Sequence, residues 1–285
     1  MNTAERIDKV LGEKLFQNRS GLAGNLAAAA AERKASILSG ADIENPGKPE
    51  KGYLELEDAI NPGKVENVRK QHERLISEGV AEDARQDGEL VTSNLRAGKM
   101  DFRDKMPGVR ELLSPAIRET VKNYYGTYFR PAYVRSYRNY HVPGEIEKRV
   151  EPKLWHLDYF TPDHLRVFIP LDDVSADDGP TQALSWRQTS SLMKRHSYGE
   201  LNQVDGPAAE REHVEFTGKT GSAFFMNPAR SLHRAGNPLP GHHRDVLVFT
   251  FEPAAEPLED DWLENIDRYT KSFQDMTGLS RLLPD

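Results

Sequence analysis

The sequence predicts a mainly β chain with flanking helices (α+β), in which an antiparallel sandwich or barrel forms the core. The first observation is a series of short runs rich in Val, Phe, Tyr and Ile, separated by turn signals, at 132–142, 165–171, 213–216, 222–226 and 244–252. Short strands at such close intervals are typical of antiparallel sandwiches and barrels. The second observation is helical spacing of apolar residues on both sides of these runs.

The elements before the strand-rich region are expected to be mostly helical. The segment 1–40 predicts two helices, and the second ends at Gly40, a natural residue after a helix. Leucine alternates with glutamate over 54–57, which predicts one short, half-exposed strand. A surface helix is expected from about Val65 to Gly79.

The next segments are a connector and a well-defined helix. Residues 80–105 are polar and weakly periodic, which favours a solvated connector, with a mobile lid as the alternative. Ser114 and Pro115 begin a helix that Gly126 ends. The tail, 258–283, returns to helical spacing.

The composition excludes several kinds of reactive site and several classes of partner. The chain has 285 residues, a net charge of −7 and no cysteine. Disulfides, thiolate metal sites and a cysteine nucleophile are therefore excluded, so a metal must be held by His and carboxylate. The negative charge argues against nucleic-acid binding. No apolar run approaches the roughly 20 residues of a membrane span, and the N-terminus fits neither a signal nor a transit peptide, so we expect a cytoplasmic protein without membrane contact.

One set of residues has the pattern of a metal-binding site. Trp155-His156-Leu157-Asp158 places a His and an Asp two residues apart, so both side chains can reach one point from a strand end. His233 follows 77 residues after His156, near another β-like run. Two imidazoles and one carboxylate form the facial triad of non-haem Fe(II) oxygenases, which leaves other coordination positions open.

A second His-x-Asp motif, His243-Arg244-Asp245, lacks a histidine downstream. We therefore interpret His242 and His243 as loop residues rather than as a second metal site. Arg244 lies 11 residues after His233 and opens a strand-like run. Its planar guanidinium would suit the carboxylate at the far end of a 2-oxo acid that chelates iron.

These pieces, in this order, resemble the 2-oxoglutarate-dependent Fe(II) dioxygenases, and most closely the phytanoyl-CoA dioxygenase-like (PhyH-like) family. The further matching pieces are Gly52 to Ile60, Phe168 to Asp173, Asp178-Gly179-Pro180-Thr181, Gly221 before a Phe-rich strand, and Asn237-Pro238 after His233. The resemblance implies a double-stranded β-helix (jelly-roll, cupin-like) core. It also implies a single dioxygenase domain over 1–285, with a mostly helical region at 1–128, a catalytic core at 129–254 and a helical tail at 255–285.

The resemblance further implies Fe(II), 2-oxoglutarate and O₂ as cofactor and co-substrates. His156, Asp158 and His233 would bind iron and act in catalysis, and Arg244 would hold the C5 carboxylate of 2-oxoglutarate. Thr181 and the strand before Pro143-Gly144 would supply further contacts.

On that strand, counting back with period 2 predicts that Tyr140, Arg138 and Ser136 point inward. A slip of one residue would instead place Asn139, Tyr137 and Arg135 there.

Residues that could meet the substrate are less well defined. Arg166 either points into the barrel or takes a rim position on the opposite face. Further candidates are Trp155, Tyr159, His164 and Trp186, although packing or a solvated turn also explains them. The stretch Ala183 to Arg187 departs from the family pattern on the substrate side, so the known family substrates do not transfer.

The predicted function is hydroxylation of an unactivated C–H of a small, polar metabolite or natural-product intermediate, with 2-oxoglutarate decarboxylated to succinate and CO₂. Asp158 argues against halogenation, because related halogenases have a small residue there. Desaturation and ring formation remain open. Two alternatives are a cupin-like metal enzyme that does not use 2-oxoglutarate and a non-catalytic interaction protein. Homo-oligomerisation through the N-terminal helices is a further expectation.

Overall fold

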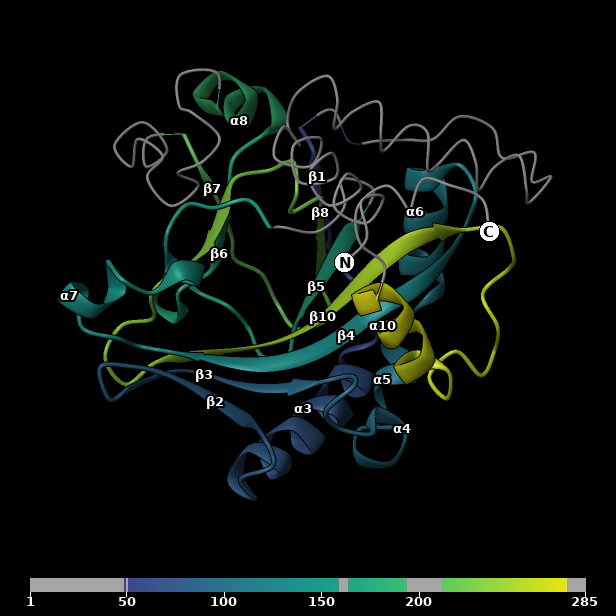
Figure 1. The fold of residues 1–285 in the computed structure, drawn as a ribbon, viewed down its shortest axis with the longest axis horizontal. Helices are drawn as coiled ribbons and strands as arrows, with labels where there is room; N and C mark the ends of the chain where they lie inside the picture. The colour runs from purple at the N-terminus through teal and green to yellow at the C-terminus, as the bar shows by residue number, and fades with distance from the viewer. Residues whose placement is uncertain (1–48, 50, 159–163, 194–211, 276–285) are drawn as a thin grey trace, which may run out of the picture.

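Two antiparallel sheets lie face to face, and helices pack on the outer face of the larger one (Figure 1). The computed structural model describes residues 49, 51–158, 164–193 and 212–275, to which the following description is confined. The helices expected within 1–40 lie outside these residues.

The larger sheet has the strand order β1-β8-β5-β10-β4-β3-β2. Its strands are β1 (Tyr53–Leu56), β2 (Glu82–Gln86), β3 (Glu89–Arg96), β4 (Tyr128–Tyr140), β5 (Leu165–Pro170), β8 (Ala223–Met226) and β10 (His243–Ala254). The smaller sheet has the order β7-β6-β9, with β7 (Val214–Phe216), β6 (Thr181–Ala183) and β9 (His233–Ala235). The strands expected from the sequence are therefore present, within a few residues at each end.

The helices begin and end where the sequence provides caps. The helices are α3 (Pro62–Ser77), α4 (Phe102–Lys105), α5 (Val109–Leu112), α6 (Pro115–Tyr125), α7 (Gly144–Glu147), α8 (Trp186–Met193) and α10 (Ile266–Asp275), with 3₁₀ turns η1 (Glu151–Lys153) and η2 (Ala176–Asp178). In α6, the Ser114 hydroxyl accepts a hydrogen bond from the amide of Ile117, and Gly126 ends the helix in the left-handed conformation. Both ends match the sequence prediction.

Alternation along the strands separates two apolar layers. On β10, Leu247, Phe249 and Phe251 belong to the outer layer, which packs against α3, α4, α5, α6 and the segment around Trp262. Val246 and Val248 belong to the inner layer, between the two sheets. Burial of each such side chain contributes about 1.5–3 kcal/mol, so the outer layer anchors the sheet on its helices while the inner face remains available for a site.

The segment 80–105 differs from the expected connector or lid. It forms the hairpin of β2 and β3, and β3 pairs with β4 at the end of the larger sheet. The region before residue 129 thus contains three strands among its described residues, where one was expected. The period-2 signal in β3 was hard to recognise because Ser93 interrupts the buried face between Val91 and Leu95, which leaves three polar residues in a row at 92–94.

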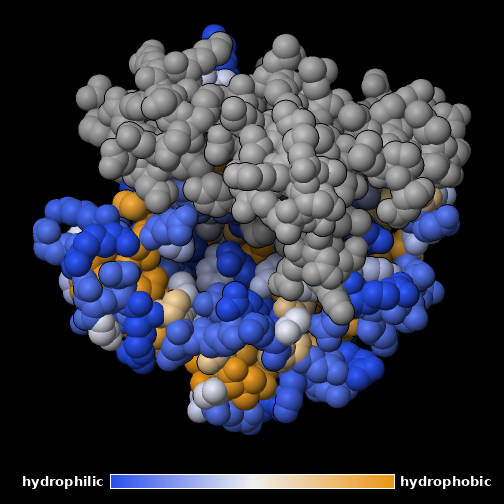
Figure 2. Space-filling view, viewed as in Figure 1, coloured by the Kyte–Doolittle hydropathy of each residue, from blue (hydrophilic) through white to orange (hydrophobic). Residues whose placement is uncertain are grey.

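The surface is mainly hydrophilic on the face shown in Figure 2, where apolar residues form separate small groups. Among the described residues, the exposed large apolar side chains are Val80 and Leu239. No helix in the described part of the chain has the length and apolarity needed to cross a membrane.

Candidate functional site

A backbone bridge joins the two histidines of the predicted triad. The amide of His156 donates to the carbonyl of His233 at 3.0 Å, and the amide of His233 donates back to the carbonyl of His156 at 3.0 Å. The amide of Asp158 donates to the carbonyl of Pro228 at 3.0 Å, which ties the end of the motif to the β8–β9 connection. Segments distant in sequence are thereby held at one point between the sheets.

Both imidazoles are oriented in the same way. Nδ1 of His156 lies 2.7 Å from the carbonyl oxygen of Leu154, and Nδ1 of His233 lies 3.0 Å from that of Ser231. A carbonyl oxygen only accepts, so each Nδ1 carries the proton. Each Nε2 is then left with its lone pair, which is the form of histidine that binds a metal.

The carboxylate of Asp158 completes the cluster. Its Oδ1 lies 3.5 Å from Nε2 of His156 and 3.8 Å from Nε2 of His233, and one ligand atom from each residue lies within 4.8 Å of the others. Its Oδ2 pairs with Nη1 of Arg166. Burial alone would raise the pKa of Asp158, but Arg166 and His156 outweigh it and hold that pKa well below its ordinary value. The carboxyl group is therefore ionised.

Burial and the neighbouring imidazole of His156 lower the pKa of His233 to about 3. His233 is therefore neutral at ordinary pH. Two imidazoles and one carboxylate on one side of a point have the chemistry of a facial metal site. Within the described residues, this is the group of His and carboxylate side chains with metal-binding geometry.

Arg244 is buried at the start of β10, beside Tyr137 of β4. Its Nη1 donates to the carbonyl of Gly179, whereas its Nε and Nη2 are buried and have no hydrogen-bond acceptor among the described residues. Burial lowers the pKa of Arg244, and the adjacent Tyr137 opposes that shift. Unsatisfied buried donors are costly, and a fork of two of them is complementary to a carboxylate.

Gly179 explains part of the Asp-Gly-Pro-Thr motif. It adopts a φ of +66°, and a Cβ there would lie 2.5 Å from the backbone nitrogen of Pro238. Only glycine allows this close approach of the η2–β6 turn to the segment that follows His233. The turn then presents its carbonyl to Arg244.

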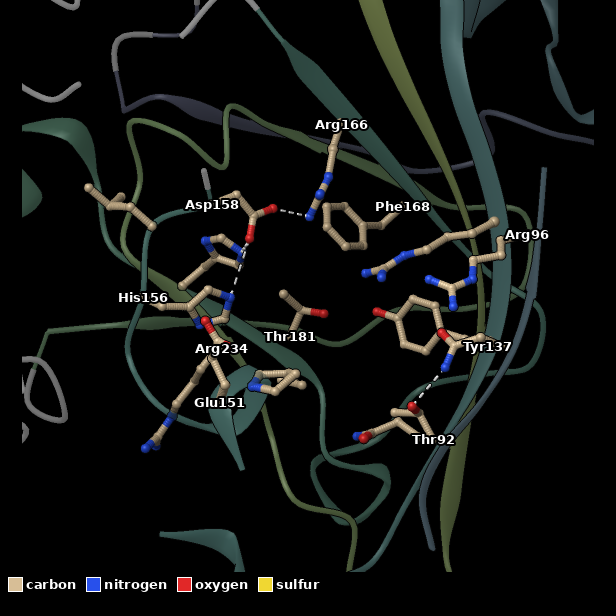
Figure 3. A pocket seen from close by; sticks show the side chains of 17 residues that line it. Thr92, Arg96, Tyr137, Glu151, His156, Asp158, Arg166, Phe168, Thr181 and Arg234 are labelled. Atoms are coloured by element: carbon tan, nitrogen blue, oxygen red, sulfur yellow. Dashed lines mark hydrogen bonds and ion pairs between the residues drawn. The ribbon is translucent and has the colours of Figure 1, made fainter. Parts of the chain in front are cut away.

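A cavity of about 390 Å³ opens beside the triad. Figure 3 shows His156 and Asp158 on one side of it, Tyr137, Arg96 and Thr92 on the other, and Thr181 between them. Its lining comes from β3, β4, β5, β6, β9 and the segment from η1 to Asp158: Thr92, Asn94, Arg96, Arg135, Tyr137, Asn139, Glu151, Pro152, His156, Leu157, Asp158, Arg166, Phe168, Thr181, His233, Arg234 and Ala235.

The β4 residues that were expected to point inward are wrong by one position along the strand. Ser136 lies on the outer face, where its hydroxyl is 2.8 Å from Nδ1 of His72 on α3. Arg138 forms a two-bond ion pair with Asp245, and the Tyr140 hydroxyl lies 3.2 Å from that of Ser93. The alternative register holds, with Arg135, Tyr137 and Asn139 lining the cavity.

The expected substrate residues are dispersed. Arg166 points into the cavity, so the expected inward orientation is correct and the rim position on the opposite face is wrong. Trp155 is buried against His213 and Arg234, and Trp186 lies under Arg230. Neither indole is in the cavity lining.

Three other histidines that were considered from the sequence lie outside the triad. His164 is buried with its Nε2 3.8 Å from Glu252, outside the cavity lining. His242 is an exposed loop residue whose Nδ1 is 2.9 Å from Asp178. His243 is also exposed, but it pairs with Tyr140 as the first residue of β10 and is not the expected loop residue. Tyr159 lies outside the described residues.

Sequence reasoning did not single out several lining residues. On β3 and in the η1 segment these are Thr92, Asn94, Arg96 and Glu151, and on β5 and β9 they are Phe168 and Arg234. Arg234 directly follows His233, so the period-2 rule for a strand could not place both in one cavity. It reaches the lining while its Nε hydrogen-bonds Gln182.

The chain matches no protein-family model and no curated protein sequence. Solved structures do match it. The epimerase SnoN in complex with Fe3+, alpha ketoglutarate and nogalamycin RO has a TM-score of 0.55 and 15% identity, over 79% of this chain and 84% of that chain. The non-heme alpha ketoglutarate dependent carbocyclase SnoK has a TM-score of 0.51 and 16% identity, over 71% and 80%. EctD from S. alaskensis with bound Fe has a TM-score of 0.50 and 15% identity, over 77% and 75%.

The chain has the fold of these enzymes. The predicted jelly-roll core with flanking helices is thereby confirmed. At such low identity the likeness concerns the fold, and two of the neighbours catalyse different reactions, an epimerisation and a ring closure. The chemistry of this chain must therefore be argued from its own residues.

Proposed function

We propose that this chain is a non-haem Fe(II)- and 2-oxoglutarate-dependent oxygenase. The observation that carries the proposal is the presence of two features around one cavity: the triad lines it, and Arg244, which is outside the lining, lies beside Tyr137 of the lining. Two Nε2 atoms and a carboxylate oxygen converge within 4.8 Å, and the buried guanidinium of Arg244 nearby has two donors without an acceptor among the described residues. A metal-chelating 2-oxo acid with a second carboxylate satisfies both features at once.

His156, Asp158 and His233 would hold the iron. Hard Fe(II) is suited by imidazole and carboxylate ligands, and a three-residue face leaves positions for other ligands. The carbonyls of Leu154 and Ser231 keep both imidazoles in the binding tautomer. These residues therefore fit the metal without rearrangement of the backbone.

Arg244 would bind the C5 carboxylate of 2-oxoglutarate through its free fork. Tyr137 lies beside Arg244, and Thr181 lines the cavity between β4 and the triad. Asn139 shares the inward face of β4 and is a further contact. Ser136, Arg138 and Tyr140 take no part in this arrangement, because they point to the other face.

Bound iron and 2-oxoglutarate would supply the oxidising power, with 2-oxoglutarate converted to succinate and CO₂. The chain's own residues would orient the substrate and exclude water from the cavity. We infer hydroxylation of a C–H bond as the outcome, because Asp158 occupies the position that a halogenase leaves open. PhyH-like family membership is part of the same proposal and is supported by the order of the motifs.

The test is iron- and O₂-dependent succinate formation by the purified protein, with a panel of small polar metabolites screened for stimulation. We expect succinate formation to disappear in Asp158→Ala. A stimulating substrate should gain an oxygen atom from isotopically labelled O₂, whereas desaturation or ring closure would leave the product unlabelled. Succinate formation that persists in Asp158→Ala would contradict the proposed iron site.

A further inference from the structure

The cavity wall opposite the metal triad is made by paired polar residues of two strands. In the register of β3 and β4, Arg96 lies directly opposite Arg135, and Asn94 opposite Tyr137. All four line the cavity, with Thr92 and Asn139 continuing the same wall. Arg96 is exposed, Arg135 is half-buried and Asn139 is buried. Polar groups that face a cavity in this way indicate recognition rather than packing.

The opposed pair Arg96 and Arg135 is unfavourable by itself. Cβ atoms of directly opposite residues are about 4.5–5.5 Å apart, and like charges at that position destabilise a sheet. Arg96 is compensated by Glu82 on β2, to which its Nε donates at 2.6 Å. Arg135 has no carboxylate within ion-pair distance among the described residues, and its guanidinium lies 4.6 Å from the centre of the Tyr137 ring.

The remaining arginines do not relieve Arg135. Burial lowers the pKa of Arg166 and of Arg244, and the charge of Arg135 lowers both further, so the three guanidinium groups lie close enough to repel one another. Arg166 is already paired with Asp158, and in the proposed function Arg244 belongs to 2-oxoglutarate. Arg135 is thus the cation without an assigned anion.

The whole site remains positive after the proposed cofactors are added. Iron(II) and the two carboxylates of 2-oxoglutarate cancel in charge. Four arginines line the cavity, Arg96, Arg135, Arg166 and Arg234, against the carboxylates Glu151 and Asp158. Outside the lining, Arg244 lies beside Tyr137, and Glu82 is paired with Arg96. This positive charge includes the buried Arg166 and Arg244, where water screens it poorly, and Arg96, which is exposed.

We propose that the substrate is a small molecule with an anionic group, a carboxylate or a phosphate, which Arg135 binds together with Arg96 on the wall opposite the metal. This inference rests on the proposed function and names its substrate class. The planar forks of both arginines suit such oxyanions. An anchor on β3 and β4 would direct the rest of the molecule across the cavity toward the metal. A volume of about 390 Å³ is at the small end of ligand pockets.

The experiment uses full-length protein loaded with Mn(II) and saturating 2-oxoglutarate, so that no turnover occurs. Inorganic phosphate and isotopically labelled acetate are titrated separately, and the paramagnetic relaxation of their NMR signals reports binding near the metal. Acetamide is the uncharged control. The variants are Arg135→Gln and Arg96→Gln, with Arg110→Gln, paired with Glu264 at the surface, as the matched arginine control. Affinity for 2-oxoglutarate is measured in each variant.

We expect the anion to bind wild type and Arg110→Gln, and to bind Arg135→Gln about 10- to 100-fold more weakly, with 2-oxoglutarate affinity unchanged. The anion that binds more tightly, phosphate or acetate, identifies the substrate group. Binding of neither anion to wild type, or equal binding to Arg135→Gln, overturns the inference. Loss of 2-oxoglutarate affinity in Arg135→Gln also overturns it, because Arg135 would then belong to the co-substrate. Wild type that fails to bind 2-oxoglutarate refutes the proposed function instead.

Discussion

His156 and His233 exchange two backbone hydrogen bonds of 3.0 Å across 77 residues of sequence, and their ring centres lie 4.4 Å apart. The bridge fixes both main chains, and each ring is then held by a carbonyl two residues earlier. Neither feature depends on a metal. The site is therefore organised by the fold before any ligand arrives, which is the arrangement expected of a functional centre.

Replacement of either histidine should abolish metal binding. Removing a residue that supports a ligand typically costs 10- to 100-fold in affinity, so His156→Ala or His233→Ala should weaken Fe(II) or Mn(II) binding by more than about 100-fold. Equilibrium dialysis with metal analysis measures this. The matched control is His243→Asn, which changes an exposed histidine at the first position of β10 and should leave one metal bound per chain. Full metal occupancy in both alanine variants would show that the cluster is not the site.

Arg244→Gln should separate binding of the co-substrate from binding of the metal. The side chain loses the charged fork for the C5 carboxylate, so affinity for 2-oxoglutarate should fall about 10- to 100-fold. Metal affinity should be unchanged, because Arg244 contacts Gly179 rather than the triad. Calorimetric titration of 2-oxoglutarate into the metal-loaded variant measures the effect. An unaltered affinity for 2-oxoglutarate would show that Arg244 does not bind its C5 carboxylate.

Arg138→Gln tests the register of β4. Arg138 holds the buried carboxylate of Asp245 on the outer face. A buried charge left without a partner costs about 3–5 kcal/mol. Asp245 would keep the contact of its Oδ1 with Nε2 of His72 at 3.3 Å, and Arg138 is partly exposed, so the expected loss in the free energy of unfolding lies at or below the lower end of that range. Affinity for 2-oxoglutarate should remain that of the wild type. Urea unfolding measures the free energy of unfolding, and calorimetry measures the affinity for 2-oxoglutarate. A loss of 2-oxoglutarate binding without a loss of stability would mean that Arg138 points into the cavity.

Acid stability should depend on Glu252. Burial would raise the pKa of this carboxyl, but hydrogen bonds and charge from His164 and Arg130 prevail and lower it from 4.5 to about 2. A pKa that is lower in the folded state contributes stability that is complete above about 4.5 and is lost as the pH falls toward 2. The contribution at neutral pH is at most about 3 kcal/mol.

Urea unfolding of wild type and Glu252→Gln between pH 7 and pH 3 checks this dependence. Wild type should be the more stable protein at pH 7, and its advantage should shrink below about pH 4.5. A difference in unfolding free energy that stays constant over this range would mean that Glu252 does not cause the acid sensitivity.

The sequence predicted the elements whose signals are local. Ser114 and Gly126 cap α6 at the expected ends, and apolar runs identified the strands around Arg166 and Arg244. The triad was predictable because His156 and Asp158 share a short motif and His233 follows at a suitable distance. Register was not predictable in β4, because Ser136 and Tyr137 both sit in a run of mixed polarity with no apolar face to mark the inside.

The strand β3 was missed for a related physical reason. Its cavity side carries Thr92, Asn94 and Arg96, and Ser93 interrupts the buried face between Val91 and Leu95, so the alternation of a half-buried strand is lost over 92–94. The opposition of Arg96 and Arg135 comes from pairing across the sheet, which no local pattern encodes. The residues that would select a substrate are thus the ones that sequence alone did not bring together.

Anaerobic titration of 2-oxoglutarate into the Fe(II)-loaded protein tests the central claim most directly. The account predicts a weak visible charge-transfer band that requires both iron and 2-oxoglutarate, saturates at one equivalent per chain, and is absent in His233→Ala. Folded protein that binds iron yet shows no such band would contradict the assignment of this site to 2-oxoglutarate-dependent chemistry.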